Sequence, residues 1–224
     1  MLKDNLVFFS ECFRNFKTTG SFWPTSRKAA LALSAPIHHI RGSRSILEIG
    51  PGTGSITVVL LEQMTEKDSL TLCEINPRLM KCLKERLAQN PYYQKHASRV
   101  HFFLGAVQEM PEDKTFNAVV CAVPFNNFDN TITKEIFEKA ERLAEDGAWM
   151  SYYEYIVLGD AKKMSPLHNQ RQRISGVMRY IKKEWMPYLI NKKSIWTNML
   201  PIHVYTLDLT GHRSAQRYQD KKAS

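Results

Sequence analysis

A glycine loop and a later glutamate are the residues whose types and spacing point most directly to chemistry. Residues 45–54 read SILEIGPGTG, an apolar run followed by glycines at every second position, and 55–64 then reads as a helix. Glycine allows positive φ and lets a ligand approach the backbone, and a loop that ends at a helix N-terminus presents free N–H groups. The next apolar run, 70–73, ends in Glu74. Because an acid at the end of a second strand typically holds ribose hydroxyls, the two features together predict a nucleoside-binding site.

The pattern Glu-x-Gly-x-Gly-x-Gly, followed by an acid after the second strand, resembles the S-adenosylmethionine site of class I methyltransferases. The alternative is a glycine-rich turn that binds nothing. Class I methyltransferases often carry an Asp after the third strand to contact adenine, but Ala106 stands there, so that contact is absent or comes from Gln108 or the backbone. The resemblance implies that the following residues bind S-adenosylmethionine: Glu48, Gly50, Pro51, Gly52, Thr53, Gly54, Glu74, Ile75, Asn76, Ala106, Val107 and Ala122.

The end of the predicted fourth strand is where an acceptor would meet the methyl group, because ligands bind outside the carboxyl ends of such strands. Adenine-methylating enzymes resemble one another there in an Asn, Asp or Ser, then any residue, a Pro and an aromatic. This chain has Ala122-Val123-Pro124-Phe125. The side chain of Ala122 has no acceptor for an adenine amino group, which counts against base methylation.

The predicted fifth strand ends in Tyr152-Tyr153-Glu154-Tyr155. Strand alternation puts Tyr153 and Tyr155 on one face and Tyr152 and Glu154 on the other. One interpretation is that these residues pack under helices. The other is that they line a site in which tyrosine rings favour a methylammonium product and tyrosine hydroxyls orient the amine.

Composition limits the class of protein. A chain of 224 residues that is 43% hydrophobic is long enough for one α/β domain with extensions, and its formal net charge of +9 indicates an anionic partner, either nucleic acid or an anionic membrane surface. The 4 cysteines form no C-x-x-C pair, which favours reduced thiols in a cytoplasmic protein, and we expect no metal site. Without an apolar run of roughly 18 residues or a signal peptide, we expect the protein to be neither integral to a membrane nor secreted.

Alternating strands and helices predict a parallel sheet built from right-handed βαβ units. We expect strands over 45–49, 70–74, 100–104, 117–123 and 148–155, helices over 55–64, 76–90 and 131–144, and an antiparallel hairpin over 195–209 made of the segments 196–201 and 203–207. The predicted fold class is α/β, a Rossmann-like class I methyltransferase fold with a mostly parallel sheet and a C-terminal antiparallel hairpin. An N-terminal amphipathic helix and a basic helical insertion complete it.

Three segments flank or interrupt the predicted methyltransferase domain of 36–210. Residues 1–35 hold an amphipathic, phenylalanine-rich helix over 1–17 and a lid segment, in which Thr25 or Ser26 would cap a helix to residue 34. The helix either packs on the domain or lies in a lipid headgroup layer. The insertion 159–193 carries nine Lys or Arg against two acids, interleaved with Trp, Tyr and Met, which suits an anionic membrane or nucleic-acid phosphates. The tail 211–224 is predicted to be disordered.

Over most of its length the chain resembles the bacterial phospholipid N-methyltransferases, which methylate phosphatidylethanolamine. The segments that carry the resemblance are the N-terminal helix, Asn15–Arg27, Glu48–Gly54, Glu74-Ile75-Asn76-Pro77, Val123-Pro124 and Trp196-x-Asn198-x-x-Pro201-x-x-Val204-Tyr205. The resemblance implies a cytoplasmic enzyme peripherally attached to the inner face of the membrane, with a phospholipid substrate and an anionic membrane surface as partners.

Removal of a proton from the lipid ammonium is assigned by hypothesis to Tyr153 or Glu154, directly or through water. Residues expected to contact the lipid are Trp23, Ser26, Arg27, Pro124, Phe125, Tyr155, His168 and Arg171. Two other functions stay open. One is an RNA methyltransferase similar to the ribosomal RNA adenine N6-dimethyltransferases, for which nucleic acid is the less favoured partner. The other is a noncatalytic membrane-binding protein with a vestigial cofactor fold.

Overall fold

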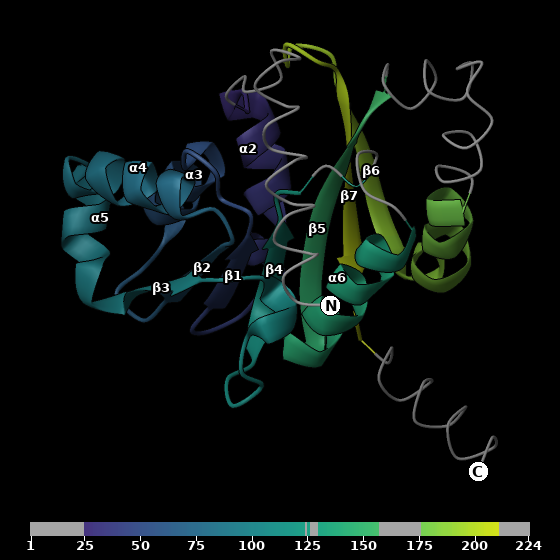
Figure 1. Cartoon of the computed structure of the whole chain (residues 1–224), viewed down its shortest axis with the longest axis horizontal. Helices are drawn as coiled ribbons and strands as arrows, with labels where there is room; N and C mark the ends of the chain where they lie inside the picture. The colour runs from purple at the N-terminus through teal and green to yellow at the C-terminus, as the bar shows by residue number, and fades with distance from the viewer. Residues whose placement is uncertain (1–24, 124, 126–129, 157–175, 211–224) are drawn as a thin grey trace.

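The computed structural model describes residues 25–123, 125, 130–156 and 176–210. They form a seven-stranded sheet in the order β3-β2-β1-β4-β5-β7-β6, with helices on both faces (Figure 1). The predicted helix 1–17, the first part of the basic insertion and the tail 211–224 lie outside the described residues. The predicted fold class is confirmed, because the sheet is mostly parallel and closes with antiparallel C-terminal strands.

Strands β1 to β5 are parallel, and β7 runs antiparallel to both β5 and β6. The strand order reverses between β1 and β4, which is the point where such sheets bind ligands at their carboxyl ends. The strands are β1 Ser45–Ile49, β2 Ser69–Glu74, β3 Val100–Leu104, β4 Phe116–Cys121, β5 Ala144–Tyr155, β6 Leu189–Ile195 and β7 Ile202–Asp208.

Helices begin where local capping favours them. Ser26 caps α2 as predicted, because its side chain accepts from the Ala29 N–H, and Asn76 caps α4 by accepting from two N–H groups. The α-helices are α2 Arg27–Ser34, α3 Ser55–Gln63, α4 Pro77–Ala88, α5 Pro91–His96 and α6 Asn130–Leu143. Short helical turns are η1 Ala35–His39, η2 Ala97–Arg99, η3 Val107–Glu109, η5 Ile181–Trp185 and η6 Met186–Tyr188.

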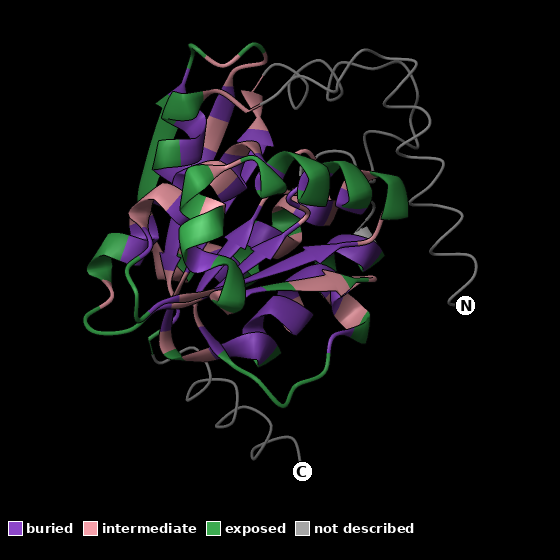
Figure 2. Cartoon of the chain, turned by 90° about the vertical axis from the view of Figure 1, so that its left-hand side faces the viewer, coloured by how far each residue is buried: buried purple, intermediate pink, exposed green. Residues whose placement is uncertain are grey.

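The sheet separates two apolar cores. On one face α2, α3 and α4 pack on residues such as Ile46, Leu72 and Tyr153. On the other face α6 and residues 177–185 pack on Val119 and Tyr152 among others. Figure 2 shows this layering, with buried positions along the strands and exposed positions on the outer faces of the helices. The alternation predicted for the end of β5 is thereby confirmed.

The C-terminal hairpin is shifted from its prediction. Residues 196–201 form the turn rather than a strand, and the first strand is β6, so Lys192 and Lys193 belong to a strand and not to a helical insertion. Five consecutive residues of β6, 190–194, are exposed. Charged side chains are usual on such an edge strand because they discourage pairing with another chain, but they hide the alternation by which a strand is predicted.

Smaller differences have local causes. The helix predicted over 76–90 ends at Ala88, and Asn90 then caps a further helix, α5, whose first residue is Pro91. Strand β5 begins at Ala144, four residues before its prediction, and its pairing with β4 shifts register between Phe116 and Ala118.

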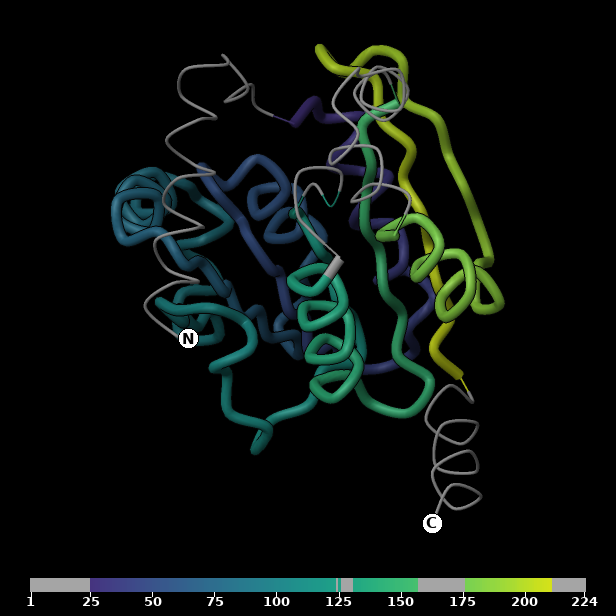
Figure 3. Tube along the Cα trace, turned by 45° about the vertical axis from the view of Figure 1, so that its right-hand side comes forward, coloured from purple at the N-terminus to yellow at the C-terminus, as the bar shows by residue number. Residues whose placement is uncertain are grey.

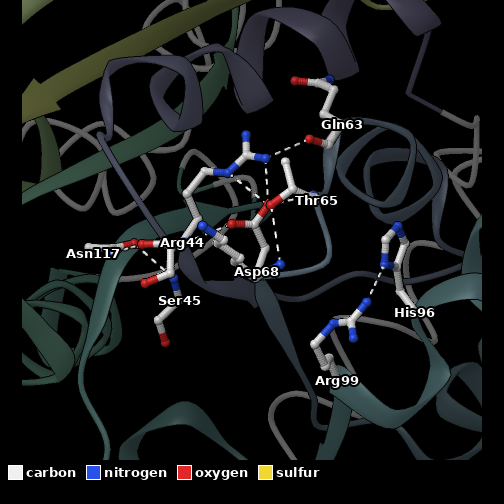
Figure 4. Close-up of polar contacts among 10 residues, drawn as sticks. Arg44, Ser45, Gln63, Thr65, Asp68, His96, Arg99 and Asn117 are labelled. Atoms are coloured by element: carbon white, nitrogen blue, oxygen red, sulfur yellow. Dashed lines mark hydrogen bonds and ion pairs between the residues drawn. The ribbon is translucent and has the colours of Figure 1, made fainter.

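A buried polar network joins the amino ends of the parallel strands (Figure 4). The Arg44 side chain binds the Asp68 carboxylate through Nε at 3.0 Å and also through Nη2, which donates to the Gln63 carbonyl at 2.7 Å as well. Thr65 donates to the same carboxylate through its N–H at 2.6 Å and its hydroxyl at 2.9 Å. The network ties β1, β2 and the end of α3 together at the edge opposite the glycine loop.

Candidate active site

The three glycines of the loop between β1 and α3 all take positive φ: Gly50 at 73°, Gly52 at 58° and Gly54 at 85°. A Cβ on Gly50 would lie 2.8 Å from Val123 Cγ2, and one on Gly54 would lie 2.5 Å from Leu83 Cδ1. A Cβ on Gly52 would meet nothing within 4 Å. The outer glycines therefore permit tight packing of the loop on its neighbours, while Gly52 leaves the backbone open to a ligand.

Glu74, at the end of β2, joins the loop to the next helix. Its Oε2 accepts from the Gly52 N–H at 3.0 Å and its Oε1 from the Asn76 N–H at 2.9 Å. The side chain is almost completely buried. Burial raises the pKa of Glu74, against the opposing effect of the backbone N–H groups. The predicted proximity of the loop and this acid is thus observed directly.

Glu48, in β1, is fully buried on the α3 face of the sheet. Its Oε2 accepts from the Thr57 hydroxyl at 2.7 Å, whereas its Oε1 is buried without a hydrogen-bond partner among the described residues. Burial raises the pKa of Glu48 to about 8; the Thr57 hydrogen bond opposes the shift and the nearby Glu74 adds to it. A buried carboxyl oxygen without a partner is costly, which is typical of a position that a ligand completes.

The loop after β3 is joined to Glu74 and to its own first turn by backbone hydrogen bonds. The Gly105 N–H donates to the Glu74 carbonyl at 3.0 Å, and the Ala106 N–H donates to Glu109 Oε2 at 3.1 Å. Gln108, expected as one replacement for the missing acid, instead donates through Nε2 to Glu135 Oε2 at 3.4 Å. Its amide is therefore held by α6, and the source of an adenine contact stays a prediction.

The remaining predicted cofactor positions lie along the same edge. Ala122 follows β4, and its N–H donates to the Ile49 carbonyl at 2.8 Å, beside the glycine loop. Val107 is buried in the core behind its loop. Pro51, Thr53 and Ile75 lie in the loops that follow β1 and β2. The open face at Gly52, the unpartnered Glu48 Oε1 and the buried Glu74 together fit a ligand that carries ribose hydroxyls and a cationic group.

Glu154, near the carboxyl end of β5, is buried and accepts a hydrogen bond from the Tyr205 hydroxyl of β7 at 3.2 Å. Tyr205 stacks on Tyr152 with ring centroids 4.8 Å apart. On the opposite face, the rings of Tyr153 and Tyr155 meet edge to face at 5.5 Å. Burial raises the pKa of Tyr153 well above its ordinary value, and the neighbouring Tyr155 adds to the shift.

The predicted lipid contacts are placed less uniformly. Ser26 uses its side chain as the α2 cap, and both guanidinium Nη atoms of Arg27 donate to the Glu62 carboxylate, at 3.0 and 2.7 Å. Phe125 is completely buried, with its ring centroid 4.6 Å from that of Phe137, so it is a core residue and its prediction as a substrate contact is corrected. The predicted contacts that lie outside the described residues are Trp23, Pro124, His168 and Arg171.

Several residues of the site were not singled out in the sequence. Thr57 holds Glu48 from one turn into α3, and Tyr205 holds Glu154 from a strand far along the chain. Asn198 accepts from the Ser26 N–H at 2.8 Å and so joins the hairpin turn to α2. The only signal for the last two was their presence in the C-terminal motif that carries the family resemblance.

Comparison with known proteins agrees with the fold. Residues 46–147 match the family described as "Methyltransferase domain". Among solved structures, the chain is similar to the O-methyltransferase TomG from Streptomyces achromogenes in complex with SAM, at 20% identity and a TM-score of 0.59, covering 92% of this chain and 89% of that one. It is also similar to the glycopeptide N-methyltransferase MtfA complexed with sinefungin, at 14% identity and a TM-score of 0.60, covering 81% and 87%.

A curated relative matches a shorter segment. The probable dimethyladenosine transferase of Dictyostelium discoideum is 38% identical over 55 residues, which are 25% of this chain and 17% of that protein. The fold is that of class I S-adenosylmethionine-dependent methyltransferases, and the glycine loop and Glu74 stand where that fold binds its cofactor. Within the chain, 46–147 is the part that carries the methyltransferase domain. In the described residues, no helix combines the length and apolarity that a membrane span needs.

Proposed function

We propose that this protein transfers methyl groups from S-adenosylmethionine to the headgroup amine of phosphatidylethanolamine and of its methylated forms at a membrane surface. The observation that carries the proposal is the buried carboxylate of Glu154 among tyrosines at the carboxyl end of β5, two strands from the glycine loop. A carboxylate and aromatic rings suit a cationic amine. The sequence resemblance to phospholipid N-methyltransferases and the net charge of +9 support a lipid as the molecule that carries this amine.

S-adenosylmethionine, when bound, supplies an electrophilic methyl group on a sulfonium. The glycine loop and Glu74 would hold the nucleoside, with the Gly52 backbone nearest to it, and Glu48 Oε1 offers an acceptor to a donor group. Because methyl transfer is an in-line displacement, the main contribution of these residues is to orient the two reactants and to exclude water.

The acceptor nitrogen must lose a proton before its lone pair can attack. Glu154 is the better acceptor of that proton, directly or through one water, because it is a carboxylate whose Oε2 already takes a hydrogen bond from Tyr205. The raised pKa of Tyr153 keeps its hydroxyl protonated near neutral pH. Tyr153 therefore does not act as the base, and it lies on the opposite face of β5 from Glu154, in the core under α2 and α3.

The test is transfer of radiolabelled methyl from S-adenosylmethionine to phosphatidylethanolamine vesicles, with and without anionic lipid, and with RNA as a parallel acceptor. Label is expected in the lipid fraction and should rise with anionic lipid. Glu154→Gln should lower turnover by about 10²-fold or more, with unchanged S-adenosylmethionine binding by calorimetry. Tyr153→Phe should have a smaller effect. Wild-type turnover in both variants would contradict the assignment of β5, and cofactor binding without any transfer would favour another amine.

A second candidate is methylation of an adenine amino group in RNA. The 55-residue similarity to a protein named as a probable dimethyladenosine transferase favours it. Ala122 argues against it, because its side chain offers no acceptor at the position where adenine-methylating enzymes carry one. Label in RNA alone would establish this second function and refute the lipid proposal.

A further inference from the structure

The turn of the C-terminal hairpin lies at the same edge of the sheet as the active site. Because β7 is antiparallel to β5, Ile202 at the start of β7 pairs with Tyr155 at the end of β5. Figure 3 shows the hairpin turn at the top, beside the beginning of α2 and the end of β5, and Figure 1 shows the same grouping. The turn 196–201 therefore stands next to the proposed acceptor side chains.

This turn exposes large apolar side chains in a fixed geometry. Trp196 is 66% exposed and Met199 is 58% exposed. Between them and the sheet, Asn198 accepts from the Ser26 N–H at 2.8 Å and donates to the Leu200 carbonyl at 2.9 Å, and the Ile156 N–H donates to the Pro201 carbonyl at 2.9 Å. Ile195 and Ile202, the residues on either side of the turn, are buried and anchor it to the sheet. Exposure of Trp196 is thus imposed by an anchored turn.

Positive charge accompanies these apolar side chains. Lys192 and Lys193 are exposed in β6, a few residues before the turn. At about 3.3 Å per residue, Lys193 lies roughly 10 Å along the strand from Trp196. That separation is close to the Debye length at physiological salt, about 8 Å, so a surface reached by Trp196 would still attract the lysines. Tryptophan and methionine at the tip with lysines behind them fit the headgroup layer of an anionic bilayer, where the apolar part enters and the charges stay at the phosphates.

Resting on the proposed function, we propose that the turn 196–201 is a membrane-docking element that inserts Trp196 and Met199 into the headgroup layer of an anionic bilayer. It sets the carboxyl edge of the sheet against the lipid surface, so that a headgroup amine reaches the end of β5 without leaving the bilayer. The indole suits this layer because its ring is apolar and its N–H can still bond to water or phosphate. This element is separate from the predicted N-terminal helix and is carried by the folded domain.

The direct test uses the full chain and vesicles of phosphatidylethanolamine and phosphatidylglycerol that contain brominated acyl chains, which quench tryptophan fluorescence at contact. A component of the quenching should disappear in Trp196→Phe, because Trp196 is exposed, whereas Trp185 is buried and Trp149 stacks on His39; quenching of Trp23 would be the same in both proteins. Trp196→Ala/Met199→Ala should weaken vesicle binding by on the order of tenfold. The matched control is Tyr92→Ala, which removes an aromatic side chain that is 44% exposed on α5, and it should bind as the wild type does.

Methyl transfer separates failure of the docking element from failure of the proposed function. With dihexanoyl phosphatidylethanolamine below its micelle concentration, the double variant should keep the wild-type rate, while its rate on vesicles falls with its binding. Transfer to lipid with no Trp196 quenching would overturn the docking proposal and leave the function intact. Quenching of Trp196 without transfer to any lipid would support docking and refute the function. A change in Trp196 fluorescence on adding RNA, but not on adding vesicles, would show that the partner of the turn is not a membrane.

Discussion

The amino and carboxyl edges of the parallel sheet differ in how their buried carboxyl groups are partnered. At the amino edge, the Asp68 carboxylate is surrounded by donors from Arg44 and Thr65, and the ion pair is almost completely buried (Figure 4). At the carboxyl edge, Glu48 and Glu74 are equally buried, but neither forms an ion pair with a described residue. The donors at the amino edge satisfy the Asp68 carboxylate, whereas those at the carboxyl edge leave Glu48 Oε1 without a partner among the described residues.

The difference also appears in protonation. Burial alone would raise the pKa of Asp68, but the hydrogen bonds from Arg44 and Thr65 outweigh it and hold that pKa below its usual value. Burial dominates at Glu48 and raises its pKa to about 8. At the amino edge, the protein itself supplies the hydrogen-bond partners of the buried carboxylate. At the carboxyl edge, we expect the bound ligand to supply the missing partner. A site for a ligand is recognised here by incomplete satisfaction of buried groups.

Breaking the amino edge should give the largest effect on stability. Arg44→Met removes the guanidinium and leaves the buried Asp68 charge without its main partner, so the free energy of unfolding should fall by about 3–5 kcal/mol. Urea denaturation measures the loss. The affinity of the folded protein for S-adenosylmethionine should not change, because the network lies at the opposite edge. A loss below about 1 kcal/mol would show that the donors that remain, the N–H of residue 44 and the N–H and hydroxyl of Thr65, satisfy Asp68.

The carboxyl edge should respond to pH in the opposite direction. The folded pKa of Glu48 is raised from 4.5 to about 8, so the folded state binds a proton that the unfolded state releases. The corresponding stability is complete below pH 4.5 and is lost as pH rises through 8, by on the order of a few kcal/mol. Glu48→Gln should remove this slope.

Unfolding free energies measured from pH 4.5 to 9 test the pH prediction. The wild type should lose stability relative to Glu48→Gln as pH rises, while the contribution of Asp68 in both proteins is lost only in acid, because its pKa is lowered. Parallel curves would mean that Glu48 titrates in the folded state as it does in the unfolded state.

Replacing the acid at the end of β2 should affect binding more than folding. Glu74→Gln keeps the shape, but one amide N–H then faces the N–H of Gly52 or Asn76, and the charge available to ribose hydroxyls is lost. Loss of hydrogen bonds to a charged group of about 1.5–3 kcal/mol corresponds to roughly ten- to hundredfold weaker S-adenosylmethionine binding by calorimetry. Unchanged affinity would remove Glu74 from the cofactor site.

Parts of the fold and site that depend on local geometry were predictable from sequence. The loop at Gly50 to Gly54 needs positive φ, and a strand before it and a helix after it are visible within a few residues. Glu74 was located because parallel neighbouring strands bring their carboxyl ends together. Alternation in β5 was sufficient to assign Tyr153 and Glu154 to opposite faces.

Features that depend on distant partners were not predictable. Strand β6 exists because Leu189 to Ile195 pair with β7, although its exposed lysines hide the pattern. Gln108 was one of the options for the adenine contact that Ala106 lacks, but its amide donates to Glu135 of α6. Phe125 follows a strand end typical of a substrate contact, yet Phe137 and Tyr152 cover it. In each case a partner in another element decided the outcome, and the local pattern does not contain that information.

The smallest expected effect on stability comes from Arg27, at the carboxyl edge. Its ion pair with Glu62 is solvent-exposed, with 65% of the Arg27 side chain accessible, so Arg27→Gln should leave the free energy of unfolding nearly unchanged. If Arg27 also contacts a lipid phosphate, the variant should raise KM for vesicular phosphatidylethanolamine and leave kcat unchanged. The matched control is Glu62→Gln, which breaks the same ion pair and keeps the cation. An equal KM for both variants and the wild type would mean that Arg27 contacts only Glu62. A raised KM in Arg27→Gln alone would mean that the carboxyl edge binds the lipid phosphate as well as the cofactor.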